Sequence, residues 1–285
     1  MKLKKGDTIG IIALSGDVER EKIENAKIHF EELGYKVILS KNIFQKNRYL
    51  AGSDEEKIEE LHSFFKNSEI KLILAARGGY GGIRLVNKLN YELIKSNPKP
   101  VCGFSDVTSI LLMIYKKCGI ITYHSPMAAV DFGEKINNFT EQNFFDVISD
   151  KPMSFEGGKI YNEGSAEGIL WGGNLATVVS LCGIDFLPDE DFIFFTEDLN
   201  EPVYKIDRMF QQLLNIEKFR QNCKGVVLGD FLDVDNNEWL EKLFVELSEK
   251  LNIPFAGGFK ITHETEKITL PIGKTAILRG KLLKV

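Results

Sequence analysis

The sequence predicts two α/β domains, and three observations lead to this prediction. Short apolar runs alternate with amphipathic runs along the first half of the chain. The polar, turn-rich residues 131–165 interrupt this alternation, which then resumes. Strands that alternate with helices are typical of right-handed βαβ units and a parallel sheet. We therefore expect an N-terminal domain over residues 1–150 and a C-terminal α/β domain over residues 166–285, with residues 131–165 as the candidate linker.

The first half supplies the elements of a parallel sheet. Its apolar runs predict strands at residues 8–14, 35–40, 70–76, 100–104 and 120–124. Its amphipathic runs predict helices at residues 18–34, 54–67, 82–89 and 107–119. We expect the first helix to end at Gly34, because Gly is favoured just past a helix C-terminus. We expect Ser53 or Asp54 to cap the second helix, because both residue types are favoured N-caps.

The second half contains a shorter version of the same pattern. Strands are predicted at residues 168–173, 191–197 and 224–231, and helices at residues 174–183, 203–215 and 237–252. The tail, residues 267–285, consists of short apolar runs separated by turn residues. We expect it to form a β-hairpin.

Composition and charge exclude several classes of protein. The chain has 285 residues, is 44% hydrophobic and carries a net charge of −5. A hydrophobic core is therefore expected, whereas the absence of a basic stripe argues against a nucleic-acid partner. No apolar run approaches the roughly 18 residues that span a bilayer, so we expect no membrane association. The start, MKLKKGDTIGIIALSG, superficially resembles a signal peptide, but its apolar run is short and predicts a first buried strand.

The cysteines and histidines give no indication of a metal site. Four cysteines are scattered without a CxxC motif, which favours a reduced, cytoplasmic chain. No spacing of Cys and His resembles a zinc site, and HETEK at residues 263–267 is not HExxH. We therefore expect neither a metal nor a cofactor.

Ser105 lies where an apolar strand ends and a helical pattern begins, in the stretch PVCGFSDVTSILL. A turn there would lift the hydroxyl above the sheet edge, and the Asp106 amide would lie in the first helical turn, where amides are unpaired. A nucleophile and an oxyanion donor would then be neighbours. Ser is also a favoured N-cap, and sequence position alone favours that interpretation.

A glycine-rich loop, ARGGYGG at residues 76–82, also joins a predicted strand to a predicted helix. Glycine lets the backbone pass close to a ligand and present its amides. The loop lacks the spacing of a dinucleotide fingerprint or a P-loop. A ligand-facing loop is favoured over a tight crossover turn. Arg77 at its border could pair with a substrate carboxylate or could form a structural ion pair.

Acid and base candidates follow later in the chain. Glu197 ends an apolar run, and Asp198 and Glu201 follow it, so one of them could orient a histidine or all could cap the loop. His263 lies in a polar loop, which suits a general base. The other histidines are placed differently: His29 and His62 fall in charged helical patterns and are expected at the surface, and His124 ends a strand and could line a site.

These segments together resemble the LD-carboxypeptidase family, the serine peptidases of the S66 type. The resemblance runs over nearly the whole chain. It is carried by KKGDTIGIIALSG, YLAGSDEEKIEELHSFF, ILAARGGYGGIRLV, NPKPVCGFSDVTSILL, HSPM, WGGNLATVVSLCG, FFTEDLNEPVYKIDRM and ITLPIG.

The resemblance implies a role for each matching residue. Ser105 would be the nucleophile, His263 the base and Glu197 the acid that orients it. The backbone amides of Asp106 and Gly79 would form the oxyanion hole, with Gly78 as the less favoured donor; Arg77 and Gly78 are the candidates for binding substrate. One departure is that family members usually carry Gly immediately before the histidine, whereas Ile261 and Thr262 precede it here.

The resemblance also implies a fold, a function and partners. It implies an N-terminal domain like class I glutamine amidotransferases, a smaller C-terminal domain and a homodimer. The implied activity is release of the terminal D-alanine from peptidoglycan tetrapeptides, by cleavage of an L,D-peptide bond, during cytoplasmic cell-wall recycling. Two alternatives remain open: a hydrolase of microcin C-type peptidyl-nucleotides that gives self-immunity, and a catalytically weak muropeptide-binding protein.

Overall fold

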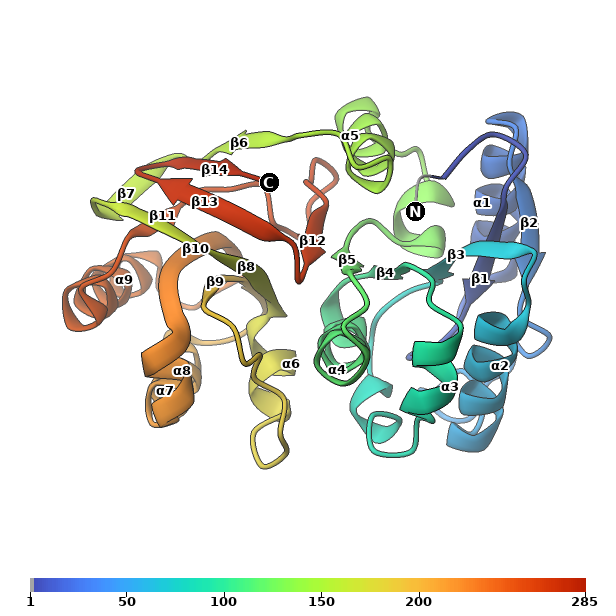
Figure 1. Ribbon diagram of the computed structural model, residues 1–285, viewed down its shortest axis with the longest axis horizontal. Coiled ribbons are helices and arrows are strands. Elements are labelled where there is room, and N and C mark those ends of the chain that lie inside the picture. Colours follow the sequence, from blue (N-terminus) through green and yellow to red (C-terminus); the bar gives the residue numbers. More distant parts are fainter. Residues whose placement is uncertain (1–2) are drawn as a thin grey trace. The chain divides into compact units, whose positions relative to one another are not determined.

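The computed structural model describes residues 3–285, which form two compact units of mixed α/β structure (Figure 1). The first unit holds the described residues up to Lys151 together with Thr269–Pro271. The second unit holds Pro152–Ile268 and Ile272–Val285. Each unit is built around one β-sheet.

The sheet of the first unit has six strands in the order β12-β5-β4-β3-β1-β2. Their bounds are Thr8–Ile12 (β1), Lys36–Leu39 (β2), Ile70–Ala75 (β3), Val101–Gly103 (β4), Thr122–His124 (β5) and Leu270–Ile272 (β12). Strands β1 to β5 pair in parallel. The carboxyl ends of these strands therefore share one edge of the sheet, which is the edge where parallel sheets bind ligands.

Helices cover both faces of this sheet (Figure 1). On one face lie α1 (Arg20–Glu32), the π-helical segment η3 (Ala128–Phe132) and α5 (Asn138–Ile148). On the other lie α2 (Asp54–Lys66), α3 (Tyr91–Ser96) and α4 (Thr108–Cys118), with the short 3₁₀ turns η1 (Gly82–Arg84) and η2 (Ser105–Val107) at loop ends. Ser53 caps α2 in a capping box with Glu56, as the sequence predicts.

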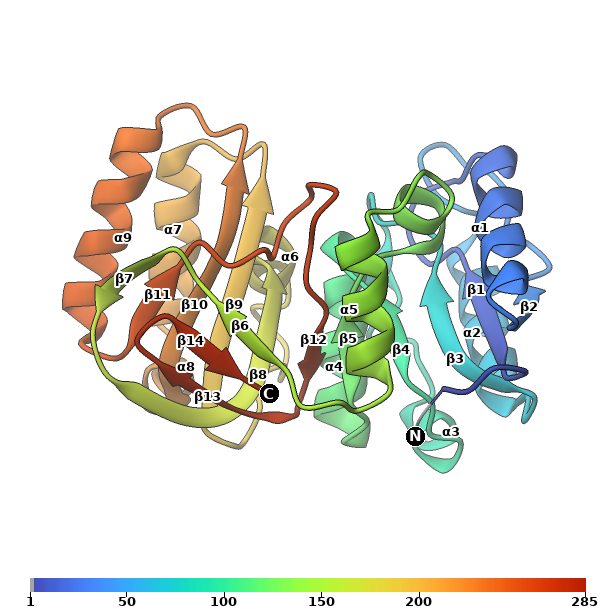
Figure 2. The ribbon, with the colours of Figure 1, turned by 90° about the horizontal axis from the view of Figure 1, so that it is seen from above.

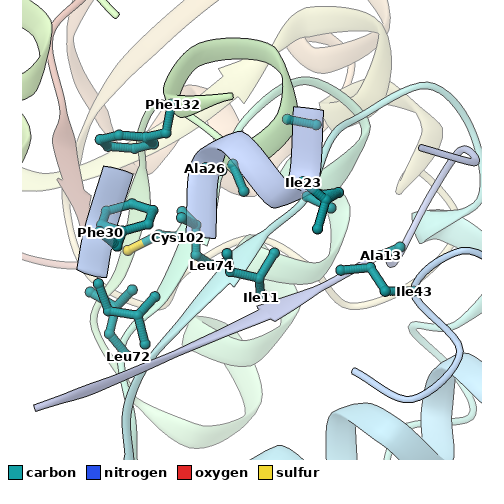
Figure 3. Packing of buried hydrophobic residues seen from close by; sticks show 14 of the residues in the cluster. Ile11, Ala13, Ile23, Ala26, Phe30, Ile43, Leu72, Leu74, Cys102 and Phe132 are labelled. Atoms are coloured by element: carbon teal, nitrogen blue, oxygen red, sulfur yellow. The ribbon is translucent and has the colours of Figure 1, made fainter. Parts of the chain in front are cut away.

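The core under α1 is closely packed (Figure 3). Phe30 of α1 is fully buried, and the centroid of its ring lies 4.5 Å from the centroid of the Phe132 ring in η3. Leu72 and Leu74 of β3 complete this layer, because alternate strand residues point to the same face. The burial explains why the strand residues form near-continuous apolar runs, as expected for a parallel sheet covered on both faces.

The sheet of the second unit has eight strands in the order β6-β14-β13-β8-β9-β10-β11-β7. Their bounds are Ser154–Glu156 (β6), Lys159–Asn162 (β7), Ser165–Asn174 (β8), Phe192–Leu199 (β9), Cys223–Leu232 (β10), Phe255–Gly257 (β11), Thr275–Arg279 (β13) and Leu282–Lys284 (β14). Strands β8 to β11 are parallel, and the outer strands pair antiparallel.

Four helices pack along this second sheet (Figure 2). They are α6 (Leu175–Ser180), α7 (Val203–Leu214), α8 (Glu217–Asn222) and α9 (Asn237–Leu251). Aromatic rings form much of the core between them and the strands. Phe194 of β9, for example, packs edge-on against Phe210 of α7 and Phe219 of α8. The central strand β9 is buried along nearly its whole length.

The structure corrects three sequence predictions. Residues 82–89 form a single 3₁₀ turn and further turns, not a helix. Residues 131–165 are not simply a linker, since α5 and its buried Phe144 belong to the core of the first unit. The tail forms the hairpin β13–β14, but β12 leaves it to become an edge strand of the first sheet. Within residues 3–285, no helix is long and apolar enough to cross a membrane.

The buried ring of Phe30 allows a test of the first core. Phe30→Ala should lower the free energy of unfolding by about 3–5 kcal/mol, because it leaves a cavity between α1 and the sheet. Urea unfolding followed by circular dichroism measures this change. Ile28→Ala on the same helix is the matched control: Ile28 is 51% exposed, so its loss should change stability by less than about 0.5 kcal/mol. Equal effects of the two substitutions would contradict the packing described.

Candidate active site

The candidate site of the first unit lies at the carboxyl ends of β1, β3 and β4. These three strands are neighbours in the sheet. Strand β2 lies on one side of β1, whereas β3 and the strands that follow it lie on the other side, so the strand order reverses at β1. Ligands bind at such a switch point in open α/β sheets. The three loops that meet there contain Ser15 and Gly16 after β1, residues 76–82 after β3, and Ser105 after β4.

Ser105 has a left-handed backbone, with φ of 60°. This conformation costs a non-glycine residue roughly 1–2 kcal/mol and is common where strain serves function. It also excludes the helix-cap interpretation, because an N-cap residue has extended backbone angles. The turn η2 begins at Ser105 itself, after the extended Phe104. The half-buried Ser105 side chain therefore lies on a sharp strand-to-helix turn.

The glycine loop passes directly over this turn. A Cβ atom added to Gly78 would lie 3.0 Å from the Oγ atom of Ser105, and 3.5 Å from the backbone nitrogen of Asp106. Gly79 follows with φ of 110°, a conformation that side chains rarely adopt. Glycine at both positions is what allows the loop to approach the Ser105 hydroxyl so closely.

One hydrogen bond sets the orientation of the peptide between Gly78 and Gly79. The amide of Gly16 donates to the carbonyl oxygen of Gly78 over 3.1 Å. Because the carbonyl and amide of a trans peptide point in opposite directions, the Gly79 N–H points away from Gly16. Neither the Gly79 amide nor the Asp106 amide donates to an acceptor within residues 3–285. Two unpaired donors therefore belong to the segments that meet at Ser105.

A pocket of about 450 Å³ adjoins the glycine loop and is lined by Gly16, Asp17, Tyr49, Arg77, Gly79 and Tyr80. Arg77 donates from Nη1 to the carbonyl of Asp17 over 3.2 Å, whereas its buried Nε makes no hydrogen bond within the described part of the chain. Tyr49 and Tyr80 are about half exposed, and their rings meet edge-on at 5.7 Å. The pocket thus combines a cation with two aromatic surfaces.

Glu197 and His263 come together in the second unit. Nδ1 of His263 lies 2.8 Å from Oε2 of Glu197. Glu197 is fully buried in β9, whereas the side chain of His263 is 17% exposed. A buried carboxylate at Nδ1 fixes the ring orientation and leaves Nε2 as the nitrogen available for proton transfer.

The loop that carries His263 is firmly anchored despite lacking a preceding glycine. Ile261 is fully buried, and its carbonyl accepts the amide of Asp230 over 2.9 Å. A Cβ atom at Gly229 would lie 2.1 Å from that carbonyl oxygen, so glycine is required on β10 to admit the loop. The Ile-Thr-His sequence therefore supports a defined path that ends with the imidazole against Glu197.

The structure also separates Glu197 from the neighbouring acids. Asp198 accepts hydrogen bonds from the side chain of Asn174 at 2.9 Å and from the amide of Ala176 at 2.9 Å. Burial raises the pKa of Asp198 to about 6, and the charge of Glu197 acts in the same direction. Glu201 pairs with Lys205 over 3.2 Å. Asp198 and Glu201 thus have other partners, and Glu197 is the carboxylate that contacts His263.

The other histidines are engaged elsewhere. His29 contacts Glu141, the Nε2 of His62 accepts the amide of Asn90 over 3.0 Å, and both side chains are partly exposed. His124 is buried, with its ring 5.8 Å from that of Phe104. In the part of the chain that the structure describes, no group of three or more His, Cys, Asp or Glu side chains could hold a metal ion.

Sequence reasoning identified most of these residues but missed others. Ser105, Asp106, Gly78 and Gly79 gather in the first unit, and Glu197 with His263 in the second. Gly16, Tyr49 and Tyr80 were not singled out as site residues. Tyr80 stands inside the glycine-rich motif, and Tyr49 begins YLAGSDEEKIEELHSFF, one of the segments that carry the family resemblance, so both could have been noticed.

Comparison with known proteins shows which family the chain resembles over most of its length. The family model described as the LD-carboxypeptidase N-terminal domain matches residues 9–125, and the C-terminal domain model matches residues 167–278. A probable murein peptide carboxypeptidase of Bacillus subtilis (strain 168) is 33% identical, over 97% of this chain and 90% of that protein.

Two solved structures share the whole fold. One is an MccF-like protein from Bacillus anthracis str. Ames, with a TM-score of 0.92 and 28% identity, covering 100% of this chain and 98% of that one. The other is a muramoyltetrapeptide carboxypeptidase from Oxalobacter formigenes, with a TM-score of 0.88 and 27% identity, covering 97% of each chain.

The left-handed Ser105 leads to a prediction about stability that does not depend on any activity. Ser105→Gly should be more stable than Ser105→Ala by about 0.5–1 kcal/mol, because glycine adopts φ of 60° without steric cost. Thermal or urea unfolding of both variants measures the difference.

The same pair of substitutions at Ser63 provides the control. Ser63 is exposed on the helix α2, where Gly should be less stable than Ala by about 1 kcal/mol. The order of Gly and Ala should therefore reverse between the two sites. If Ala is the more stable residue at both, Ser105 does not have the strained backbone described.

Proposed function

We propose that this chain, which belongs to the LD-carboxypeptidase family of peptidases, is a serine carboxypeptidase that removes the terminal D-alanine from peptidoglycan tetrapeptides. The bond cleaved would be an L,D-peptide bond, and the role would be cell-wall recycling. The observation that carries the proposal is the left-handed Ser105, covered by a glycine loop whose Gly79 amide is unpaired. That geometry suits a nucleophile next to an oxyanion hole.

In the proposed reaction, Ser105, His263 and Glu197 act as a triad. Nε2 of His263 takes the hydroxyl proton as Oγ of Ser105 attacks the scissile carbonyl, and Glu197 stabilises the imidazolium through Nδ1. The tetrahedral intermediate collapses when His263 passes its proton to the leaving D-alanine amine. Water, deprotonated in turn by His263, then hydrolyses the acyl-enzyme and restores Ser105.

The amides of Asp106 and Gly79 would stabilise the oxyanion. Both are unpaired, and the Gly78–Gly79 peptide is oriented by Gly16. Each donor of this kind contributes about 3–4 kcal/mol to lowering the barrier in comparable sites. Gly78 would contribute by the absence of its side chain, which leaves room above Ser105 for the substrate.

Arg77 is the proposed partner of the substrate carboxylate. Its guanidinium borders the pocket beside Gly79, and its Nε has no partner among the described residues. A guanidinium can bind a carboxylate through two parallel hydrogen bonds, which would select peptides with a free C-terminus. The hydrogen bond from Nη1 to the Asp17 carbonyl holds the Arg77 guanidinium at the pocket, and Nε stays available for a substrate carboxylate.

Three further features remain predictions that rest on the family resemblance. They are the likeness of the N-terminal domain to class I glutamine amidotransferases, a homodimeric state and a cytoplasmic location.

Hydrolysis of peptidyl-nucleotides of the microcin C type is the second candidate function. The similarity to an MccF-like structure and the half-exposed rings of Tyr49 and Tyr80 favour it, because aromatic surfaces can stack on a nucleobase. A third candidate, muropeptide binding with little catalysis, was suggested by the altered histidine loop. The contact between His263 and Glu197 speaks against that candidate.

Removal of the Ser105 hydroxyl tests the proposed nucleophile. Ser105→Ala should lower the rate of D-alanine release by about 10³-fold or more, because no acyl-enzyme can form. Its melting temperature should stay close to that of wild type. Chromatographic measurement of D-alanine released from a tetrapeptide gives the rate, with Ser63→Ala as an active control. A Ser105→Ala protein that retains the wild-type rate would refute the assignment.

A direct comparison of substrates tests the choice of function. Wild-type protein is incubated with a tetrapeptide that ends in D-alanine and, separately, with a peptidyl-nucleotide, and the products are weighed by mass spectrometry. We expect faster cleavage of the tetrapeptide. Faster cleavage of the peptidyl-nucleotide would favour the immunity function, and tight binding of the tetrapeptide without cleavage would favour the binding protein.

A further inference from the structure

The buried carboxylate of Asp106 joins the three loops of the first-unit site. Its Oδ2 accepts the hydroxyl of Ser15, in the loop after β1, over 2.6 Å. The same oxygen accepts the amide of Gly82, at the end of the glycine loop after β3, over 2.7 Å. Asp106 itself follows Ser105 in the turn after β4 and is 8% exposed. One side chain thus connects all three strand ends.

The packing around these bonds is tight. A Cβ atom at Gly82 would lie 2.6 Å from Oγ of Ser109 and 2.7 Å from the carbonyl oxygen of Asp106. Ser109 donates to that carbonyl over 2.9 Å and so helps to fix the backbone of Asp106 beside Gly82. The end of the glycine loop is therefore held directly against the backbone that follows the proposed nucleophile.

A buried cation lies behind the glycine loop. The side chain of Lys57 on α2 is 2% exposed, and its Nζ would lie 3.1 Å from a Cβ atom at Gly81. Its distance to Asp54 Oδ1, 3.7 Å, is beyond hydrogen-bond length. Asp54 instead binds Arg84 at 2.8 Å and Lys88 at 3.1 Å, and Arg84 foremost holds the pKa of Asp54 at about 2.

The positive charge of Lys57 also affects the pKa of Asp106. Burial raises the pKa of Asp106, whereas the hydrogen bonds from Ser15 and the loop amides, and the charge of Lys57, oppose that rise. Both bonds at Oδ2 are strongest when the acceptor is ionised, because charge-assisted hydrogen bonds are stronger than neutral ones.

We propose that the Asp106 side chain is a positioning residue, which holds the glycine loop over Ser105 and thereby aligns the two oxyanion amides. This inference rests on the proposed function. It gives a role to the carboxylate of Asp106, whereas the proposed function used only the backbone amide of that residue. Through Gly82, the carboxylate fixes the end of the loop. Through Ser15, it fixes the residue next to Gly16, whose amide orients the peptide that carries the Gly79 N–H.

The loss of rate that we expect follows from the geometry of the reaction. A misplacement of about 1 Å costs up to about 100-fold in rate, and complete loss of an oxyanion donor costs about 10²–10³-fold. Because the amides act on the transition state and not on the bound substrate, the loss should fall on kcat with KM little changed.

The kinetic experiment uses Asp106→Ala, which retains the backbone amide, and the milder Ser15→Ala. We expect kcat for tetrapeptide cleavage to fall about 30-fold in Asp106→Ala and about 5-fold in Ser15→Ala, with KM within about 3-fold of wild type. Phenylboronic acid, which forms a tetrahedral adduct with a reactive serine, should bind more weakly by about the same factors. Ser15→Ala tests the proposal even if Asp106→Ala fails to fold.

Ser40→Ala is the matched control. Ser40 is buried at the carboxyl end of the neighbouring strand β2, and its hydroxyl makes no hydrogen bond within residues 3–285. It should leave kcat and phenylboronic acid binding unchanged. If folded Asp106→Ala and Ser15→Ala keep the wild-type kcat, or lose no more activity than Ser40→Ala, the proposal is wrong.

A measurement without substrate separates this proposal from the proposed function. Hydrogen–deuterium exchange of peptides covering residues 76–84 should be about 10-fold faster in Asp106→Ala than in wild type or Ser40→Ala, because the Gly82 amide loses a charged acceptor. Unchanged exchange would overturn the anchoring. If wild type cleaves neither substrate while exchange accelerates in Asp106→Ala, the proposed function fails and the anchoring of the loop stands.

Discussion

The left-handed backbone at Ser105 is the constraint on which the first-unit site depends. A residue with φ of 60° reverses the chain sharply between β4 and α4, so the hydroxyl and the next amide leave the sheet edge together. An ordinary N-cap with extended angles would instead direct its side chain toward its own helix. Such strain persists only where the surroundings over-determine it. Here the surroundings are the glycine loop above Ser105 and the buried bonds of Asp106 beside it.

The two units contribute different kinds of chemistry. The first offers neutral donors and a hydroxyl, held by backbone geometry at the ends of parallel strands. The second offers an acid–base pair in which a fully buried carboxylate faces a partly exposed imidazole. Burying Glu197 without a partner would be costly, so its contact with His263 is also what makes its position on β9 acceptable. In the proposed reaction, the first unit therefore supplies the nucleophile and the oxyanion donors, and the second supplies the general base and the acid that orients it.

Local pattern was sufficient for β1, which is one continuous apolar run, and for α2 and α9, whose buried residues recur at helical spacing. It failed where tertiary packing decides. The helix predicted at residues 82–89 does not form, since the first residues after the glycine loop are fixed by Asp106 and Asp54. The helix α5 was missed because its polar neighbours resembled a linker, although Phe144 is fully buried. No local signal could place β12 beside β5, because that pairing joins residues far apart in the sequence.

The site shows the same limit on a smaller scale. Residue types and the family resemblance led to Ser105, Glu197 and His263 as the proposed catalytic residues, because each carries a reactive group and lies in a segment that resembles the family. The groups that hold them in position carry no such mark: Gly16 acts through an amide, Gly229 through the absence of a side chain, and Ser15 through one hydroxyl on a distant carboxylate. Their roles depend on which strand ends are neighbours, and sheet order is a property of the whole chain. Candidates for reactive residues can therefore be proposed from local sequence, whereas the residues that would align them become visible only with the fold.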